Sequence, residues 1–150
     1  MQSSTARRPL RIYIDENMPP QMAEALNLIQ STLNEEEKHP PIEVLAIEKM
    51  FGKGTDDEDW IPPIGQEKGI VITQDRVIQR SKAQRELYMK SGVGIFFLKA
   101  PKTGMNSWDM FTKLIKWWPD MKKIARKNPT PFAYRQPGQN VPFEEWKSND

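Results

Sequence analysis

The sequence of 150 residues predicts an α/β fold in which a mainly parallel sheet is covered by helices on both faces. Two observations predict this class: short β-branched segments alternate with longer segments of helical spacing, and no internal repeat interrupts the alternation. The length suits one domain, so we expect residues 1–150 to form a single domain. Sites in such sheets form at the carboxyl ends of the strands, and we expect the functional residues at that edge.

Three strands are expected in the first half of the chain, at residues 10–14, 42–47 and 70–73, because each segment is short and apolar. The helix between the first two strands begins at Pro19-Pro20, since proline suits the first turn of a helix. A shorter helix follows the second strand. Its prolines, Pro62-Pro63, cannot donate backbone hydrogen bonds, so we expect this helix to be distorted or to restart there.

The second half of the chain continues the alternation. A helix is expected over 81–91, a strand over 93–98, a helix over 107–117, and a further short helix from Pro119. The aromatic residues of the 107–117 helix lie at helical spacing, which is typical of a core face or of a contact between two copies of the chain, as in a homodimer. Residues 129–150 are rich in proline and glutamine, and we expect them to form an extended arm.

The composition excludes several kinds of site. The chain has no cysteine and a single histidine, His39, which lies in a polar stretch. It therefore has no thiolate metal site or cysteine nucleophile, and a Ser–His triad or a multi-histidine zinc site could be built only around His39. The sequence contains neither the roughly 18 apolar residues of a membrane span nor the pattern of a signal peptide, so we expect a cytoplasmic protein without a membrane partner.

The charges are nearly balanced but unevenly distributed, with 22 Lys and Arg against 20 Asp and Glu. Residues 34–59 carry nine acidic and three basic side chains, whereas 76–90 carry five basic and one acidic. Residues 113–135 carry seven basic and one acidic. The acidic region could attract a cation and the basic regions a polyanion, or all three could be solvated helix faces.

Three acidic positions could form a metal site at the carboxyl edge of the sheet. Asp15 follows the first strand, Asp75 follows the third, and Asp57 begins the short helix beside Asp56 and Asp59. Each acid taken singly is more readily explained as a turn or helix-cap residue, and it is their coincidence that favours a site. Like charges about 4 Å apart repel by roughly 4 kcal/mol at an effective dielectric of 20, so such a cluster needs a cation or a shared proton. Oxygen ligands alone favour Mg²⁺ or Mn²⁺ over zinc.

Helix geometry limits which acids of the second segment could act together. Residues two apart on a helix point to nearly opposite sides, so Asp57 and Asp59 cannot both be direct ligands in a regular helix. Asp56 and Asp59, three apart, could be.

Three motifs resemble those of the PIN-like nuclease domains, a family that includes the compact VapC-type toxins. They occur in the family's order, and the resemblance covers roughly residues 10–100. Residues 101–150 extend beyond this core as a helical and extended C-terminal extension. The motifs are Ile14-Asp15-Glu16-Asn17-Met18-Pro19-Pro20, then Gly54-Thr55-Asp56-Asp57-Glu58-Asp59-Trp60-Ile61-Pro62, and Val71-Ile72-Thr73-Gln74-Asp75-Arg76 followed by Ile78-Gln79-Arg80.

The resemblance implies a three-layer α/β/α sandwich, a Mg²⁺- or Mn²⁺-dependent endoribonuclease acting on RNA, and a protein antitoxin as partner. Carried over by position, Asp15, Asp57 and Asp75 are the metal-binding and catalytic acids, and Asp59 is a fourth acid that holds a water molecule or a second ion. We rank Glu16 below these, because a side chain one residue further along a strand points the other way.

Basic residues near the third motif are expected to bind the substrate. Arg76 and Arg80 follow Asp75 closely enough to line the same edge, and a guanidinium can grip a phosphate with paired hydrogen bonds. Thr73 of the same motif is a further substrate-binding prediction. A second basic segment, more readily explained as a solvated face, could bind nucleic acid or an acidic partner; it comprises Lys113, Lys116, Lys122, Lys123, Arg126 and Lys127.

Two other functions compete with the nuclease. The first is a catalytically inactive PIN-like module that binds RNA or protein through its basic tail. The second is a phosphoacceptor receiver-like domain, since Asp15-Glu16 also resembles an acid pair after a first strand. That fold needs a lysine after a fifth strand, and we find no convincing fifth strand with such a lysine.

Overall fold

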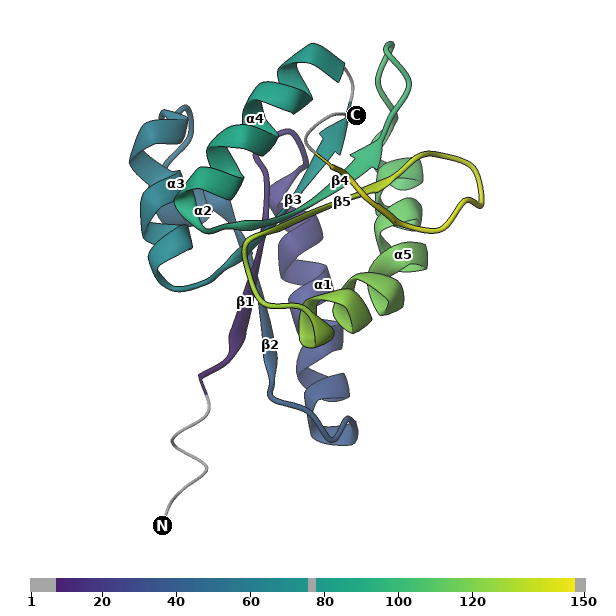
Figure 1. Ribbon diagram of the computed structural model, residues 1–150. Helices are drawn as coiled ribbons and strands as arrows, with labels where there is room; N and C mark the ends of the chain where they lie inside the picture. The colour runs from purple at the N-terminus through teal and green to yellow at the C-terminus, as the bar shows by residue number, and fades with distance from the viewer. Residues whose placement is uncertain (1–7, 76–77, 148–150) are drawn as a thin grey trace.

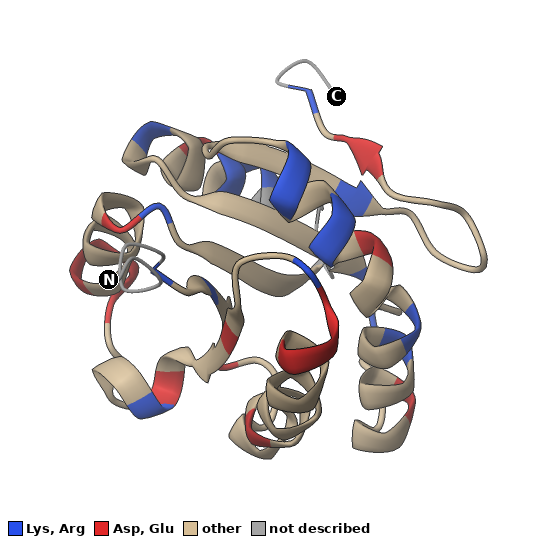
Figure 2. Ribbon diagram, turned by 90° about the horizontal axis from the view of Figure 1, so that it is seen from below, with Lys and Arg blue, Asp and Glu red and all other residues tan. Residues whose placement is uncertain are grey.

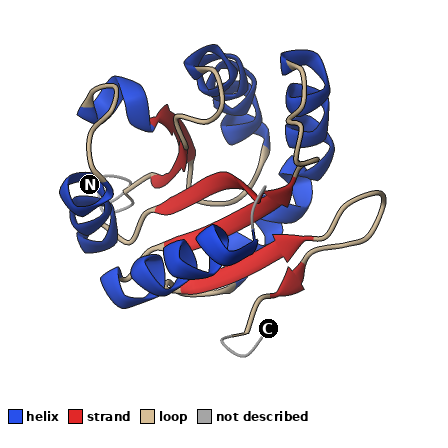
Figure 3. Ribbon diagram, turned by 90° about the horizontal axis from the view of Figure 1, so that it is seen from above, coloured by secondary structure: helices blue, strands red, loops and turns tan. Residues whose placement is uncertain are grey.

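The computed structural model describes residues 8–75 and 78–147, which form a sheet between two layers of helices (Figure 1). The sheet has the strand order β2-β1-β3-β4-β5-β6; the first five strands pair in parallel and β6 is antiparallel to β5 (Figure 3). The strands are β1 (Leu10–Ile14), β2 (Ile42–Ala46), β3 (Ile70–Asp75), β4 (Gly94–Lys99), β5 (Phe132–Gln136) and β6 (Glu144–Glu145).

Helices cover both faces of this sheet, which confirms the predicted α/β/α class. The helices α1 and α5 share one apolar core with the strands, and α2, α3 and α4 pack on the opposite face. The helices are α1 (Pro20–Glu36), α2 (Ile47–Phe51), α3 (Asp57–Gln66), α4 (Ile78–Ser91) and α5 (Ser107–Lys127). Within the described ranges, no helix is long and apolar enough to cross a membrane.

The last two crossovers of the sheet differ in handedness. The chain steps from β3 to β4 through α4 and from β4 to β5 through α5, in the same direction across the sheet. Because α4 lies on one face and α5 on the other, these two parallel crossovers must have opposite handedness. As a result α5 lies beside α1, where Trp118 Nε1 donates a hydrogen bond to Gln30 Oε1 at 3.0 Å.

Two helices continue through prolines where we expected a helix to be distorted or to restart. The helix α3 includes Pro62 and Pro63, whose missing N–H groups leave the carbonyls of Glu58 and Asp59 without helix partners. Both of these residues are exposed, so water can bind their carbonyls, while buried apolar side chains of α3 hold the helix on the sheet. In the same way, α5 is one helix of 21 residues that includes Pro119.

The C-terminal arm was only partly predicted. Residues 132–136 form β5, a fifth parallel strand that pairs with β4, in the segment where we expected only an extended arm. Its residues alternate between the two cores, with Phe132 on the α5 side and Ala133 on the α4 side. Trp117 and Trp118 are buried as the helical spacing predicts, whereas Trp108 is 75% exposed and lies outside the core.

Candidate active site

Asp15 and Thr73 meet at the carboxyl edge of the sheet because of the strand register. The parallel strands β1 and β3 place Ile14 opposite Ile72, so the residues that follow lie side by side. Thr73 Oγ1 donates a hydrogen bond to Asp15 Oδ2 at 2.6 Å. Thr73 is fully buried and Asp15 is only 6% exposed. We predicted Thr73 to contact substrate; what its hydroxyl does in the structure is hold the Asp15 carboxylate.

The other described partners of Asp15 are also uncharged. The backbone N–H of Glu16 donates to Oδ1 at 2.7 Å, and Asn17 Nδ2 lies 3.5 Å from Oδ2. Burial raises the pKa of Asp15; the hydrogen bonds from Thr73 and Glu16 oppose this rise, and the nearby charges of Asp57 and Glu16 add to it. The carboxylate is therefore desolvated, close to like charges, and paired with no basic side chain of the described residues.

Asp57 is the member of the second acidic motif whose charge raises the pKa of Asp15. It is the first residue of α3 and is partly buried, whereas Asp56 and Asp59 are exposed. Burial raises the pKa of Asp57, a hydrogen bond from the Trp60 side chain opposes the rise, and the charges of Glu16 and Asp56 add to it. No described contact joins Asp59 to Asp15 or Asp57, and its role as a fourth acid stays a prediction.

Glu16 belongs to this acidic group, although sequence reasoning ranked it low. The strand β1 ends at Ile14, so the alternation of side chains that we assumed does not extend to the turn that follows. Glu16 Oε2 accepts a hydrogen bond from the backbone N–H of Gly54 at 3.1 Å, which ties the turn before α3 to the end of β1. Its charge acts on both Asp15 and Asp57.

Tyr88 is a residue of this region that the sequence analysis missed. It lies in α4, is fully buried, and packs against Trp60 with 5.8 Å between ring centroids. Its hydroxyl has no hydrogen-bond partner among the described residues. Burial raises the pKa of Tyr88 well above its usual value, and the charges of Asp15 and Asp57 raise it further. A lone aromatic residue in an otherwise polar helix was the available signal.

The third motif is only partly described. Asp75 is the last residue of β3, and its backbone pairs in register with Lys99 of β4. The side chains of Asp75 and Arg80 lie outside the described residues, as does the whole of Arg76. Their predicted roles in metal and phosphate binding therefore stay predictions. Arg85 of α4 is buried and donates to the backbone carbonyl of Lys147.

The residues present suit a hard cation in chemical type. Among the side chains that the structure describes, no three carboxylates or imidazoles are close enough together to hold a metal ion. Asp15 and Asp57 supply two carboxylates, and the charge of Asp57 raises the pKa of Asp15. The Tyr88 hydroxyl, which the charges of both acids affect, has no hydrogen-bond partner among the described residues. Oxygen donors of this kind suit Mg²⁺ or Mn²⁺.

The fold and the carboxyl edge of the sheet together define the class: a mainly parallel α/β/α domain with a buried acid, Asp15, directly after its central strand β1. A family model described as "PIN like domain" matches residues 10–100, which is more than half of the chain. The chain therefore belongs to the PIN-like domain family, as its motifs predicted. Members of this family are generally nucleases, so membership is compatible with a nuclease in general. No curated protein and no solved structure was found to match the chain.

Proposed function

We propose that the protein is a Mg²⁺- or Mn²⁺-dependent endoribonuclease, and that it is the toxin of a toxin–antitoxin pair. The observation that carries the proposal is Asp15: a buried carboxylate held by uncharged donors, next to the charge of Asp57, at the carboxyl edge of a PIN-like sheet. Buried acids without basic partners are costly to stability and are typical of functional sites.

Asp15, Asp57 and Asp75 are the proposed ligands of the metal ion. A bound Mg²⁺ or Mn²⁺ would lower the pKa of a coordinated water molecule and stabilise the charge that builds up on the scissile phosphate. Thr73 fixes one oxygen of Asp15 and the Glu16 N–H fixes the other, so the carboxylate is oriented before any ion binds. Asp59, exposed on the first turn of α3, is the proposed fourth acid for a water molecule or second ion.

Arg76 and Arg80 are the proposed RNA-binding residues. They follow Asp75 in the chain, and α4, which contains Arg80, starts directly beyond the end of β3. A guanidinium at this edge would offset the charge of a phosphodiester near the acids and hold it with paired hydrogen bonds. Replacing either arginine by glutamine is expected to weaken RNA binding without removing the metal ligands.

Metal-dependent cleavage of RNA by the purified protein tests the nuclease proposal. We expect cleavage of a fluorescent RNA with Mn²⁺ or Mg²⁺, none with EDTA, and none by Asp75→Asn under the same conditions. Asp120→Asn is the matched control, because it makes the same chemical change at an exposed position of α5. Undiminished cleavage by Asp75→Asn would contradict the assignment.

The toxin proposal is tested separately in cells. Induced expression of the wild-type chain is expected to arrest bacterial growth, and Asp75→Asn is expected to be harmless at equal protein level. Co-expression of the proposed antitoxin, to be sought among the products of neighbouring genes, should restore growth by forming a stable complex with the chain. Growth arrest by both forms of the chain would show that toxicity does not come from the proposed site.

A catalytically inactive binding module is the second candidate. The observation in its favour is the C-terminal extension beyond the family match, whose helix α5 has basic residues in its last turn. A module of this kind would bind RNA in a gel-shift assay with Mn²⁺ present and leave the RNA intact over many hours. The receiver-like alternative is weaker, because β5 is followed by Pro137 and Gly138 and not by a lysine.

A further inference from the structure

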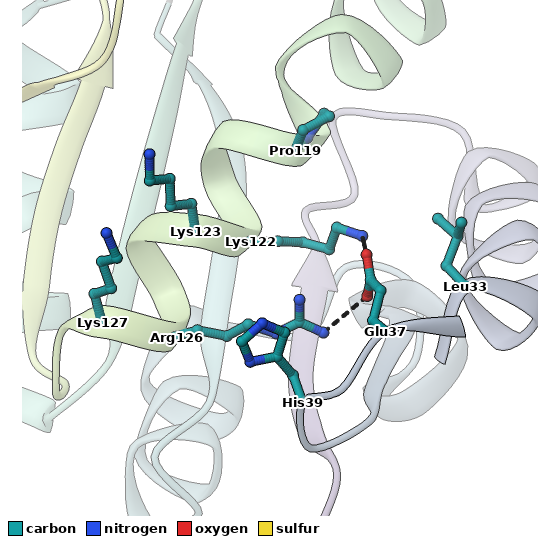
Figure 4. Close-up of a pocket in the computed structure, with 8 residues that line it drawn as sticks. All are labelled: Leu33, Glu37, His39, Pro119, Lys122, Lys123, Arg126 and Lys127. Atoms are coloured by element: carbon teal, nitrogen blue, oxygen red, sulfur yellow. Dashed lines mark hydrogen bonds and ion pairs between the residues drawn. The ribbon is translucent and has the colours of Figure 1, made fainter. Parts of the chain in front are cut away.

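A basic pocket lies at the end of the sheet opposite to Asp15, between the end of α1 and the last turns of α5 (Figure 4). Its residues come before β2 and before β5, at the amino ends of these strands, whereas Asp15 follows the carboxyl end of β1. The cavity measures about 590 Å³. Binding sites for small molecules usually span roughly 300–1,000 Å³, so the pocket has the size of a ligand site.

One carboxylate in the pocket is already paired with two cations. Glu37 Oε2 lies 2.6 Å from Lys122 Nζ, and Glu37 Oε1 lies 3.0 Å from Arg126 Nη2. Burial alone would raise the pKa of Glu37, but hydrogen bonds from Lys122, Arg126 and Gln30 outweigh it and lower the pKa to about 2. Glu37 therefore stays ionised, and its ion pairs fasten the end of α1 to α5.

The pocket holds more positive charge than Glu37 can balance. Lys123 and Lys127 line it too, from the side of α5 that is turned away from Glu37 (Figure 4), so its lining has four basic side chains, one acidic side chain and His39. Neither Lys123 nor Lys127 has an ion pair or hydrogen bond with any other described side chain, and both are exposed. They extend side by side from consecutive turns of α5 (Figure 4), an arrangement in which like charges repel. The ion pairs of Glu37 are formed by Lys122 and Arg126, and neither Lys123 nor Lys127 takes part in them.

The walls of the pocket are not uniformly charged. Leu33 of α1 and Pro119 of α5 line it together with the cations, and they supply an apolar surface beside the charged one. Ammonium and guanidinium groups bind phosphate oxygens through charge-assisted hydrogen bonds. A ligand that suits both surfaces has a phosphate at one end and a less polar body at the other.

We propose that this pocket binds a small phosphorylated ligand of nucleotide size, with its phosphate on Lys123 and Lys127 and its body against Pro119. The site is separate from the carboxylate edge, and it stands whether or not the chain is a ribonuclease. An RNA strand fits the observations less well, because single strands are usually bound in grooves with aromatic platforms and no Phe, Tyr or Trp lines this pocket.

Binding to the full-length protein tests this proposal with adenosine monophosphate, inorganic phosphate and adenosine as probes. Titrations followed by amide NMR give the affinity and also locate the site. We expect adenosine monophosphate to bind more tightly than phosphate and to shift the signals of residues 123–127, and we expect adenosine to leave them unchanged. Lys123→Ala/Lys127→Ala should weaken adenosine monophosphate binding at least tenfold, because it removes both unpaired cations.

The matched control is Lys49→Ala/Lys90→Ala, which removes two exposed lysines from other helices and should bind like the wild type. Alanine has a higher helix propensity than lysine, so the pocket variant is expected to stay folded, which circular dichroism checks. Asp15→Asn should also bind normally, which separates this site from the proposed nuclease.

Four results would overturn the proposal. They are equal binding of adenosine and adenosine monophosphate, equal affinity for adenosine monophosphate and inorganic phosphate, unchanged affinity in the double variant, and tighter binding of a polyglutamate peptide. Tighter binding of a short 5′-phosphorylated RNA than of adenosine monophosphate would assign the pocket to RNA and reject the small ligand.

Discussion

Asp15 and Glu37 are carboxylates at opposite ends of the sheet, and their surroundings shift their pKa values in opposite directions. Asp15 is bound by a hydroxyl and a backbone N–H, near other acids, and its pKa is raised. Glu37 is bound by two cations and an amide, and its pKa is lowered to about 2. Figure 2 views the molecule from the Glu37 end and shows the basic last turns of α5 beside the acidic end of α1.

The ionised carboxylate of Glu37 stabilises the folded chain, whereas the ionised carboxylate of Asp15 destabilises it. The ion pairs of Glu37 join two helices, and removing the carboxylate leaves the buried Lys122 without an anionic partner, with only the amide oxygen of Gln30 to accept its hydrogen bond. Asp15 costs the fold desolvation and like-charge repulsion, which no described basic residue offsets. Groups of this kind are typical of binding and catalytic sites. The burial and raised pKa of Asp15 therefore indicate the candidate site more specifically than the number of acidic residues in a segment does.

The largest expected effect is on catalysis. Asp15→Asn should reduce metal-dependent RNA cleavage by at least about 100-fold, because it removes a proposed metal ligand and even outer partners of metal ligands are worth 10–100-fold. Initial rates with Mn²⁺ measure it. Glu24→Gln, an exposed acid of α1, is the control and should cleave normally. A rate within twofold of the wild type would remove Asp15 from the site.

The next effect is on stability at the other end of the sheet. Glu37→Gln should lower the free energy of unfolding by about 2 kcal/mol at pH 7, less than for a fully buried pair because the Glu37 side chain is 26% exposed. Urea denaturation measures it. The neighbouring exposed residue provides the control, Glu36→Gln, which should change stability little.

The same variant has a distinct pH dependence. The pKa of Glu37 is lower in the folded chain than its ordinary value of 4.5, so the stabilisation is complete above about pH 4.5 and is lost as the pH falls towards 2. Wild type and Glu37→Gln should therefore converge in stability over this window. A constant difference between them down to pH 2 would mean that the ion pairs are not its source.

A smaller effect is expected from the hydroxyl that holds Asp15. Thr73→Val removes the 2.6 Å hydrogen bond that opposes the raised pKa of Asp15, so the acid limb of the pH–rate profile should move to higher pH. Cleavage at neutral pH should fall roughly tenfold, as for other outer partners of metal ligands. Thr112→Val, on the exposed face of α5, is the control. An unchanged profile would show that Thr73 has only a packing role.

The smallest effect has the opposite sign to that of Glu37→Gln. Without metal, Asp15→Asn should raise the free energy of unfolding at pH 7 by about 0.5–1 kcal/mol, because functional groups are often kept at the expense of stability. The raised pKa of Asp15 means that its ionisation destabilises the fold as the pH rises above its ordinary value of 3.8. Mn²⁺ should stabilise the wild type in thermal melts and leave this variant unaffected.

The sequence predicted the fold class because its strongest signals are local. The β-branched segments became β1 to β4 within a few residues of the expected bounds, and the coincidence of acids after β1 and before α3 located the edge. The features that the sequence analysis missed depend on tertiary packing. Pro119 lies in one continuous helix because Trp118 and Met121 on either side of it are both buried in the same core. Helical spacing predicted the burial of Trp118 but did not extend the pattern beyond the proline to Met121.

Part of the site depends on contacts that a sequence does not encode locally. Tyr88 is brought to this region because α4 packs beside α3 and over β4, and the hydrogen bond of Thr73 depends on the register of two strands that are distant in the sequence. Glu16 was ranked low because alternation was assumed beyond the end of β1. The sequence showed that the α5 segment is rich in basic residues. It did not show the pocket, which forms because the end of α1 lies beside α5 in the fold.

Because the last two crossovers have opposite handedness, the C-terminal third of the chain is needed to cover one face of the sheet. The family match ends at residue 100, and only because α5 crosses back over the α1 face are Phe96 and Leu98 of β4 covered there. A chain truncated at that boundary would carry a bare apolar sheet face, which is an aggregation hazard rather than a minimal enzyme. Shortened relatives of this protein would need a second chain, or a different helix, in the place of α5.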